Sequence, residues 1–134
     1  MNLEEFIQAV ENEQHDRDFS LAELTDVIDG QGVSEAKANE IIARLDPLLC
    51  MSTERDEQES YFYLLAKLYF NGRAKAMIEN IVLREIKSVD VAALFHCVEI
   101  IAESSLPTKH ELLGGLLKHD NPAIRKLVNE RISR

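Results

Sequence analysis

Histidine and cysteine side chains are the first candidates for chemistry, and the chain places one of each together at His96-Cys97. An imidazole beside a thiol can act as the base for a nucleophile. Successive side chains on a helix point about 100° apart, so these two residues are not expected to work as a pair. His110 and His119 stand at opposite ends of one predicted helix, too far apart to bind the same metal ion. The sequence therefore predicts no catalytic residue, no metal and no cofactor, and we do not expect an enzyme.

Two further patterns resemble functional motifs but lack the context that those motifs need. Asp16, Asp18 and Asp26 do not have the glycine and terminal glutamate spacing of a calcium-binding EF-hand loop. Gly114-Gly115 falls inside a predicted helix, so it is not a phosphate-binding loop. We expect these glycines to permit close helix packing or to bend the helix.

Charge is divided unevenly along the chain. The 134 residues carry 24 Asp and Glu against 15 Lys and Arg, a formal net charge of −9. Residues 1–60 hold 16 acidic and 4 basic side chains, whereas residues 61–134 hold 8 acidic and 11 basic ones. A nucleic-acid partner would require a basic footprint to neutralise its phosphates, so this balance argues against one. The asymmetry directs attention to the first half of the chain.

The acidic residues of the first half form three clusters: around a predicted loop, along one side of a predicted helix, and at the start of another helix. Acids near a helix N-terminus complement the helix dipole, so one interpretation is a solvated face. The other is a docking surface for a basic protein, because crowded like charges cost stability that a partner would offset. The residues predicted to bind that partner are Glu11, Glu13, Asp16, Asp18, Glu23, Asp26, Asp29, Glu54, Asp56, Glu57 and Tyr63.

Helical periodicity dominates the chain, and no segment alternates cleanly with the period of a strand. We predict a single all-α domain over residues 1–134, with seven or eight helices in antiparallel pairs. These would form an α-solenoid fragment or an irregular bundle. The predicted helices cover residues 2–14, 20–30, 34–45, 53–70, 74–86, 90–101, 108–117 and 122–132, with a separate short turn of helix at 46–51.

Capping residues predict where several of these helices begin and end. Capping-box spacing occurs at Asn2 with Glu5, Ser20 with Glu23 and Thr108 with Glu111. Asp46-Pro47 has the pattern of an N-cap followed by a first-turn proline, so a new short helix is expected to begin there. Asn71-Gly72 should end one long helix and let the next fold back antiparallel.

One predicted helix carries five aromatic residues: Tyr61, Phe62, Tyr63, Tyr69 and Phe70. Packing in the core accounts for most of them. A single helix face cannot bury all five, so we expect one or two to be exposed. An exposed Tyr63 or Tyr69 would suit an anchor for a partner, because tyrosine is enriched at binding hot spots.

The segment 112–132, LLGGLLKHDNPAIRKLVNERI, resembles the core of a HEAT-type repeat. It has leucines on its first helix, Asp120 and Pro122 in the turn, and Ile124 followed by Arg125 on its second helix. The resemblance implies a HEAT-like α-solenoid in which Asp120 and Arg125 fix the turn. In such a fold each helix pair covers the apolar face of its neighbour.

The chain as a whole resembles the bacterial immunity proteins that neutralise contact-dependent growth inhibition toxins, several of which are small, acidic and all-helical. The resemblance implies a cognate toxin domain as partner, often a basic nuclease. The acidic residues would cover its active site or substrate surface in place of nucleic-acid phosphates. The alternative is a HEAT-like adaptor or scaffold module that binds a protein through the groove of its last helices. Gene order separates the two, because an immunity gene directly follows its toxin gene.

Location and assembly follow from what the sequence lacks. The first residues are acidic and have no apolar segment of a secretory signal, and no apolar run is long enough to span a bilayer. Cys50 and Cys97 are too few for a disulfide scaffold and lie in apolar contexts, which favours free thiols in a reducing compartment. We expect a cytoplasmic protein without membrane contact, as a monomer or a homodimer.

Overall fold

The computed structural model describes residues 1–13, 16–50 and 52–133. Within these ranges the chain forms eight helices and no strand, so the all-α prediction is confirmed. The helices are α1 (Leu3–Asn12), α2 (Arg17–Gln31), α3 (Glu35–Leu49), α4 (Arg55–Phe70), α5 (Lys75–Glu85), α6 (Val91–Glu103), α7 (Lys109–Leu116) and α8 (Pro122–Ile132). None of the helices in the described ranges has the length and apolar character needed to cross a membrane.

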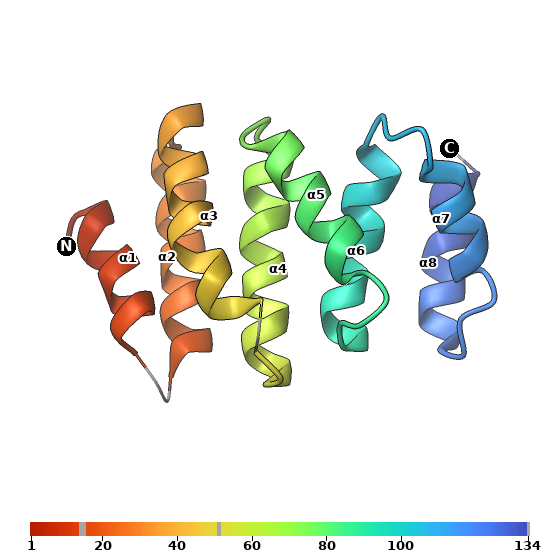
Figure 1. Cartoon of the computed structure of the whole chain (residues 1–134), viewed down its shortest axis with the longest axis horizontal. Coiled ribbons are helices and arrows are strands. Elements are labelled where there is room, and N and C mark those ends of the chain that lie inside the picture. Colours follow the sequence, from red (N-terminus) through yellow and green to blue (C-terminus); the bar gives the residue numbers. More distant parts are fainter. Residues whose placement is uncertain (14–15, 51, 134) are drawn as a thin grey trace.

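The helices stack side by side in two layers, and the two chain termini lie at opposite ends of the stack (Figure 1). The even-numbered helices form one layer, in which α4 packs against both α2 and α6, and α6 packs against α8. The odd-numbered helices run in the opposite direction and form the other layer. All four even-numbered helices therefore begin at the same edge of the molecule (Figure 1). This is the open arrangement of an α-solenoid rather than a closed bundle.

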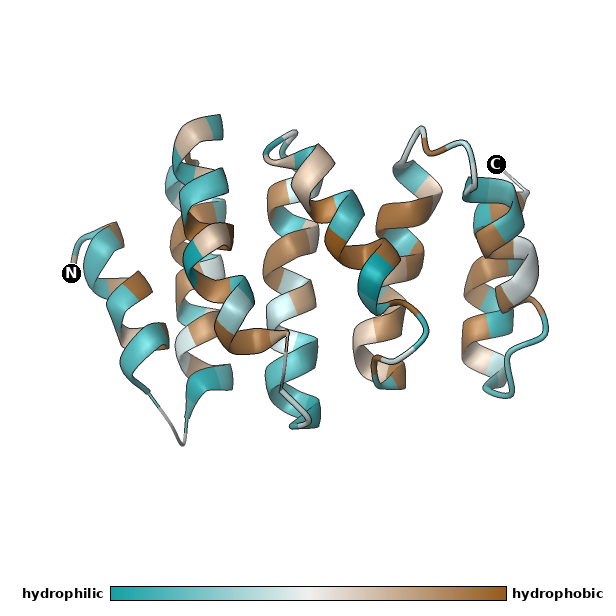
Figure 2. Ribbon diagram, in the orientation of Figure 1, coloured by the Kyte–Doolittle hydropathy of each residue, from teal (hydrophilic) through white to brown (hydrophobic). Residues whose placement is uncertain are grey.

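One cluster of buried side chains runs through the whole stack, from Ile7 in α1 to Val128 in α8. Each helix contributes an apolar side, so hydrophobic and hydrophilic residues recur along every ribbon (Figure 2). The central helix α4 is the most deeply embedded. Its buried residues are Tyr61, Phe62, Leu64, Leu65, Ala66, Leu68 and Tyr69. Both halves of the molecule therefore depend on α4 for their packing.

Hydrogen bonds from Arg125 and to Asn121 hold the turn between α7 and α8. Arg125 Nη1 donates hydrogen bonds to the carbonyl oxygens of His119 at 2.7 Å and Asp120 at 3.0 Å. Asn121 caps α8 by accepting from two backbone amides, and Pro122 occupies the first turn. Arg125 thus fixes the turn, and Asp120 takes part through its backbone.

Of the three predicted capping boxes, the one between Asn2 and Glu5 is confirmed, and the other two are wrong. α2 begins at Arg17, so Ser20 is buried inside the helix instead of capping it. The Arg17 guanidinium donates to carbonyl oxygens at the end of α1, and it thereby caps that end and starts α2 early. Thr108 stands at the N-cap of α7, but its side chain accepts no capping hydrogen bond.

The prediction that a new helix begins at Asp46-Pro47 is also wrong, because α3 continues through Pro47 to Leu49. A proline inside a helix removes one backbone hydrogen bond. Leu45 and Leu49 are both buried, and their spacing of four residues keeps them on one face only if the helix continues. Packing therefore outweighs the local cost of the proline.

Polar side-chain contacts connect each even-numbered helix to the next; two are ion pairs, and the one between α4 and α6 is a hydrogen bond. They are Asp29–Lys67 at 3.6 Å between α2 and α4, Glu59–His96 at 3.2 Å between α4 and α6, and Glu99–Arg131 at 2.6 Å between α6 and α8. Partly exposed pairs of this kind contribute little free energy each. They do fix which turns of neighbouring helices face one another.

The turn between α4 and α5 is held against the start of α3. Ala74 has a left-handed backbone, with φ of 52°, a conformation that costs a residue with a Cβ about 1–2 kcal/mol. Its amide donates to Glu35 Oε1 at 2.8 Å, and Arg73 Nε donates to the carbonyl of Val33 at 2.7 Å. These contacts offset the strain and let α5 fold back on α4, as predicted for this turn.

Candidate protein-binding surfaces

The starts of α2 and α4 bring two acidic segments, far apart in the sequence, to one edge of the molecule (Figure 1). Arg17 Nη1 lies 3.6 Å from Glu57 Oε1 and bridges the two helix starts. Asp16 and Asp18 lie beside this bridge on one helix, and Glu54 and Asp56 lie beside it on the other. Their position at helix N-termini is favourable for carboxylates, which explains why the segments tolerate this density of charge.

The outer side of α2 extends this acidic edge. Glu23 and Asp26 are exposed and lie at i+4 and i+7 from Phe19, so the three share one stripe of the helix. Phe19 is 63% exposed, an unusual position for a large aromatic side chain. We call Asp16, Asp18, Glu23, Asp26, Glu54 and Asp56 the acidic surface; none of the six has an ion-pair partner within the described part of the chain.

Three other acidic residues of the predicted set are engaged within the protein. Glu11 accepts hydrogen bonds from Arg44, Asp29 pairs with Lys67, and Glu57 pairs with Arg17. Glu13 is half-buried at the end of α1. Spacing along the chain could not separate these residues from the acidic surface, because all three of their partners are more than 30 positions away.

The aromatic helix exposes a residue other than the predicted tyrosines. Tyr69 is buried, and its hydroxyl donates to Glu79 at 2.5 Å. Tyr63 is half-buried, with its ring centroid 5.6 Å from that of His96. The exposed aromatic residue at this end of α4 is Phe70, at 51%. The prediction that an exposed Tyr69 could anchor a partner is therefore wrong, and Tyr63 is only partly available.

A large groove opens between α5 and α7 in the odd-numbered layer. Its volume is about 850 Å³. The apolar residues that line it are Leu83, Ile86, Val89, Leu94, Leu112 and Leu116. The polar residues of its lining are Lys87, Thr108, Glu111 and His119. This groove lies among the last helices, where the adaptor alternative places its binding site.

The glycine pair of α7 does not have one of its two expected roles, which is close packing against another helix. A Cβ atom added at Gly114 or Gly115 would meet no atom within 4 Å. The prediction that these glycines permit close approach of another helix is therefore wrong. Gly115 instead forms part of the groove wall, where its missing side chain leaves space.

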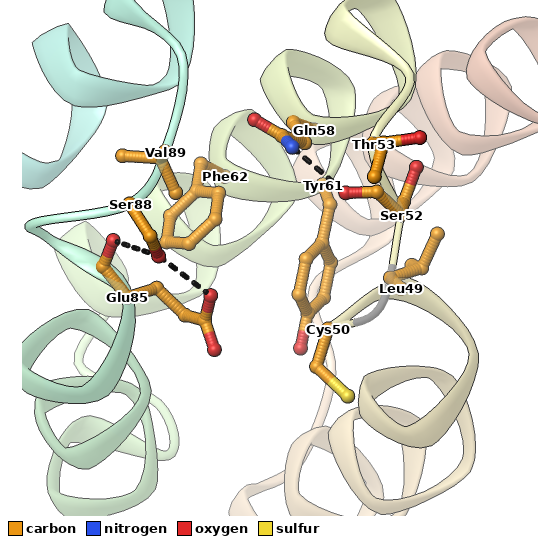
Figure 3. A pocket seen from close by; sticks show the side chains of 10 residues that line it. All are labelled: Leu49, Cys50, Ser52, Thr53, Gln58, Tyr61, Phe62, Glu85, Ser88 and Val89. Carbon is orange, nitrogen blue, oxygen red and sulfur yellow. Dashed lines mark hydrogen bonds between the residues drawn. The ribbon is translucent and has the colours of Figure 1, made fainter.

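A smaller cavity of about 220 Å³ lies where the loop before α4 meets the loop after α5 (Figure 3). Two of its polar side chains, Gln58 and Ser88, hold these loops. Gln58 Nε2 donates to the carbonyl of Ser52 at 2.7 Å, and Gln58 Oε1 accepts from the amide of Asp90 at 3.0 Å. The hydroxyl of Ser88 donates to Glu85 (Figure 3). These groups stabilise the loops instead of facing the cavity as free donors or acceptors.

Below this cavity, Asp46 joins three helices. Its carboxylate accepts hydrogen bonds from the Tyr61 hydroxyl at 2.6 Å and from Arg84 at 2.9 and 3.0 Å. Partial burial on its own would raise the pKa of Asp46, but these hydrogen bonds outweigh it and hold the pKa below its usual value. Burial and the same hydrogen bond raise the pKa of Tyr61 far above its usual value. The network is therefore a structural tie, with Asp46 ionised and Tyr61 protonated.

The residues first considered for chemistry lie apart. Cys97 is fully buried, and burial raises the pKa of its thiol to about 12, so little nucleophilic thiolate is present at neutral pH. His96 points to Glu59 and Tyr63 on the neighbouring helix. Among the described residues, no three His, Cys, Asp or Glu side chains converge as metal ligands.

No family model, curated protein or solved structure matches the chain.

Proposed function

We propose that the protein is an immunity protein that binds a basic toxin domain, such as a nuclease, through the acidic surface. The observation that supports this most is that six carboxylates, at the starts of α2 and α4 and on the exposed side of α2, have no ion-pair partner within the described residues. Elsewhere in the first half, carboxylates such as Glu11 are paired with arginine. A partner that supplies lysines and arginines would neutralise the remaining charge.

Binding of this kind would be fast and salt-sensitive. A surface of one charge sign attracts an oppositely charged protein before contact, which raises the association rate at low ionic strength. The exposed Phe19 beside the carboxylates adds an apolar contact, and buried aromatic anchors supply much of the affinity of many interfaces. Once bound, the carboxylates would occupy the toxin surface that otherwise binds phosphates.

The test uses the protein encoded by the gene directly upstream, co-expressed with this chain in cells whose growth it arrests. We expect the wild-type chain to restore growth. The double variant Glu23→Lys/Asp26→Lys should weaken the affinity measured by calorimetry by about tenfold or more, because it places like charges opposite the partner. The affinity of the wild-type chain should also fall as salt rises.

The matched control is Glu103→Lys/Glu130→Lys, which changes the net charge equally at exposed positions on α6 and α8. This control should keep most of the affinity. Equal losses in both double variants would mean that net charge alone matters. An unchanged affinity in the first variant would place the docking face elsewhere.

The groove between α5 and α7 favours a second candidate function, an adaptor module that binds a protein partner through its last helices. Its lining is apolar and open, and Leu83 on its wall is 39% exposed. Exposed apolar grooves of this kind are typical of interaction sites. Reversing Glu23 and Asp26 should leave such a partner bound, which distinguishes this function from the first.

A further inference from the structure

The groove separates α5 and α7, two neighbouring helices of the odd-numbered layer. At the other end of this layer α1 packs directly on α3, whereas α5 and α7 contact α6 but stand apart from each other. Leu112 and Gly115 line the groove from one side of α7, and Thr108 and His119 line it just before and after the helix. One full side of α7 is thus left facing open space.

The chemistry of the groove is that of a helix–helix interface. Leu83 and Ile86 lie on the α5 side, and Leu112 and Leu116 lie on the α7 side, with Leu94 of α6 between them. Rows of aliphatic side chains on both walls match an apolar stripe with residues at i, i+3, i+4 and i+7. A helix is therefore the shape of ligand that covers both walls at once.

Charges stand on opposite walls of the groove. Lys87 on the α5 side and Glu111 on the α7 side are both exposed, and neither has an ion-pair partner within the described residues. A helix lying between them would place one flank beside a positive charge and the other beside a negative charge. Complementary flanks would favour a suitable partner and disfavour a helix with the same charge on both sides.

We infer that this groove binds an amphipathic helix of a protein partner, whose apolar stripe is flanked by acidic residues on one side and basic residues on the other. The inference rests on the second candidate function and names the partner chemistry of that site. Lys87 faces the acidic flank and Glu111 faces the basic flank.

The test uses three labelled helical peptides of about 15 residues, the length at which an isolated helix becomes stable in water. All three carry the same leucine stripe. One has glutamates on one flank and lysines on the other, the second has glutamates on both flanks, and the third has lysines on both. Fluorescence anisotropy gives the affinity of each peptide for the wild-type protein and its variants.

We expect the mixed peptide to bind the wild-type protein about fivefold more tightly than either of the others, in line with one or two partly exposed charge pairs. Lys87→Glu should shift the preference to the peptide with two lysine flanks. Glu111→Lys should shift it to the peptide with two glutamate flanks. These shifts do not depend on which way round the helix lies in the groove.

Two further variants serve as controls. Lys126→Glu changes charge on the exposed side of α8 and should leave the peptide preference unchanged. Leu83→Glu should abolish binding of all three peptides, and because Leu83 is partly exposed the variant should still fold, which circular dichroism checks. An identical order of preference in the wild type and both groove charge variants would overturn the inferred charges while leaving a helix-binding groove. Binding of no peptide, or binding that Leu83→Glu leaves intact, would overturn the groove itself, and neither result bears on the acidic surface.

Discussion

The two ends of the odd-numbered layer differ in how they are closed. At one end α1 lies on α3, and Arg44 of α3 donates hydrogen bonds to both Glu4 and Glu11 of α1. At the other end, no ion pair between described residues joins α5 to α7, and the groove lies between them. The even-numbered layer beneath is continuous at both ends. The groove is therefore a feature of the odd-numbered layer alone. It can form while the core packing of the even-numbered helices stays continuous.

The comparison also explains how the acidic half remains stable. Arg44 and Arg17 neutralise three of its carboxylates across helix boundaries, and several others, such as Asp18 and Asp56, lie in the first turns of helices, where the dipole favours them. Repulsion between carboxylates is thus reduced where helices of this half pack together, and it persists on the exposed surface. In the half of the molecule that contains the groove, the exposed feature is apolar surface instead of charge.

The largest expected effect is a loss of stability, and it comes from comparing a substitution in the core with one on the groove wall. Leu64 is fully buried in α4, so Leu64→Ala should lower the free energy of unfolding by about 2–5 kcal/mol through lost burial and a new cavity. Leu112→Ala, on the half-buried groove wall, should cost less than about 1.5 kcal/mol, because water already reaches the site. Urea denaturation followed by circular dichroism measures both. Equal losses would mean that Leu112 is packed as tightly as the core.

Asp46 ties the two halves together, so its removal should weaken both. Asp46→Asn keeps the shape but loses the charge that Arg84 and Tyr61 bind, and should cost about 1–3 kcal/mol at pH 7. Because the pKa of Asp46 is lowered on folding, its stabilisation is complete above about pH 4, the unfolded value, and is lost as pH falls through the lower folded value. The difference between wild type and variant should therefore shrink between pH 5 and pH 2. A constant difference in urea denaturation across that range would contradict this role.

Arg44→Ala should loosen the closed end only. Removing the guanidinium deprives Glu4 and Glu11 of their shared partner, and we expect a loss of about 1 kcal/mol for this partly exposed site. Hydrogen exchange should accelerate in α1, with α7 and α8 unchanged. Lys109→Ala, which removes a cation from α7, serves as the control and should leave exchange in α1 unaltered. Faster exchange along the whole chain would show that the two ends are not independent.

The sequence predicts the helices well because the information is local. Apolar residues recur every three or four positions, and cap pairs such as Asn2 with Glu5 lie within one turn. The sequence fails to predict a helix start where a contact between two helices decides it. Ser20 and Glu23 have the spacing of a capping box, yet Arg17 begins the helix earlier by binding carbonyls of α1.

The sequence also predicts only part of the binding surface, because local patterns do not show which acidic residues are paired within the fold. Counting charges locates the acidic half, but it does not show that Glu11 is bound to Arg44 while Asp26 has no ion-pair partner among the residues that the structure describes. Phe19 was not among the predicted residues, although a large aromatic residue between Asp18 and Ser20 is a visible signal. The groove could not be predicted, because it depends on the distance between α5 and α7, which no local pattern encodes.

The smallest expected effect concerns α7, the shortest helix and one wall of the groove. Gly114 lies inside it with open space where a Cβ would be, so Gly114→Ala meets no steric barrier. Alanine also loses less backbone entropy on folding, and we expect a gain of about 0.5–1 kcal/mol in the free energy of unfolding. Gly72→Ala, at a φ of 76°, is the opposite control and should destabilise the protein. If Gly114→Ala also destabilised the protein in urea denaturation, α7 would have to pack more closely on its surroundings, and the contrast between a closed and an open end would be reduced.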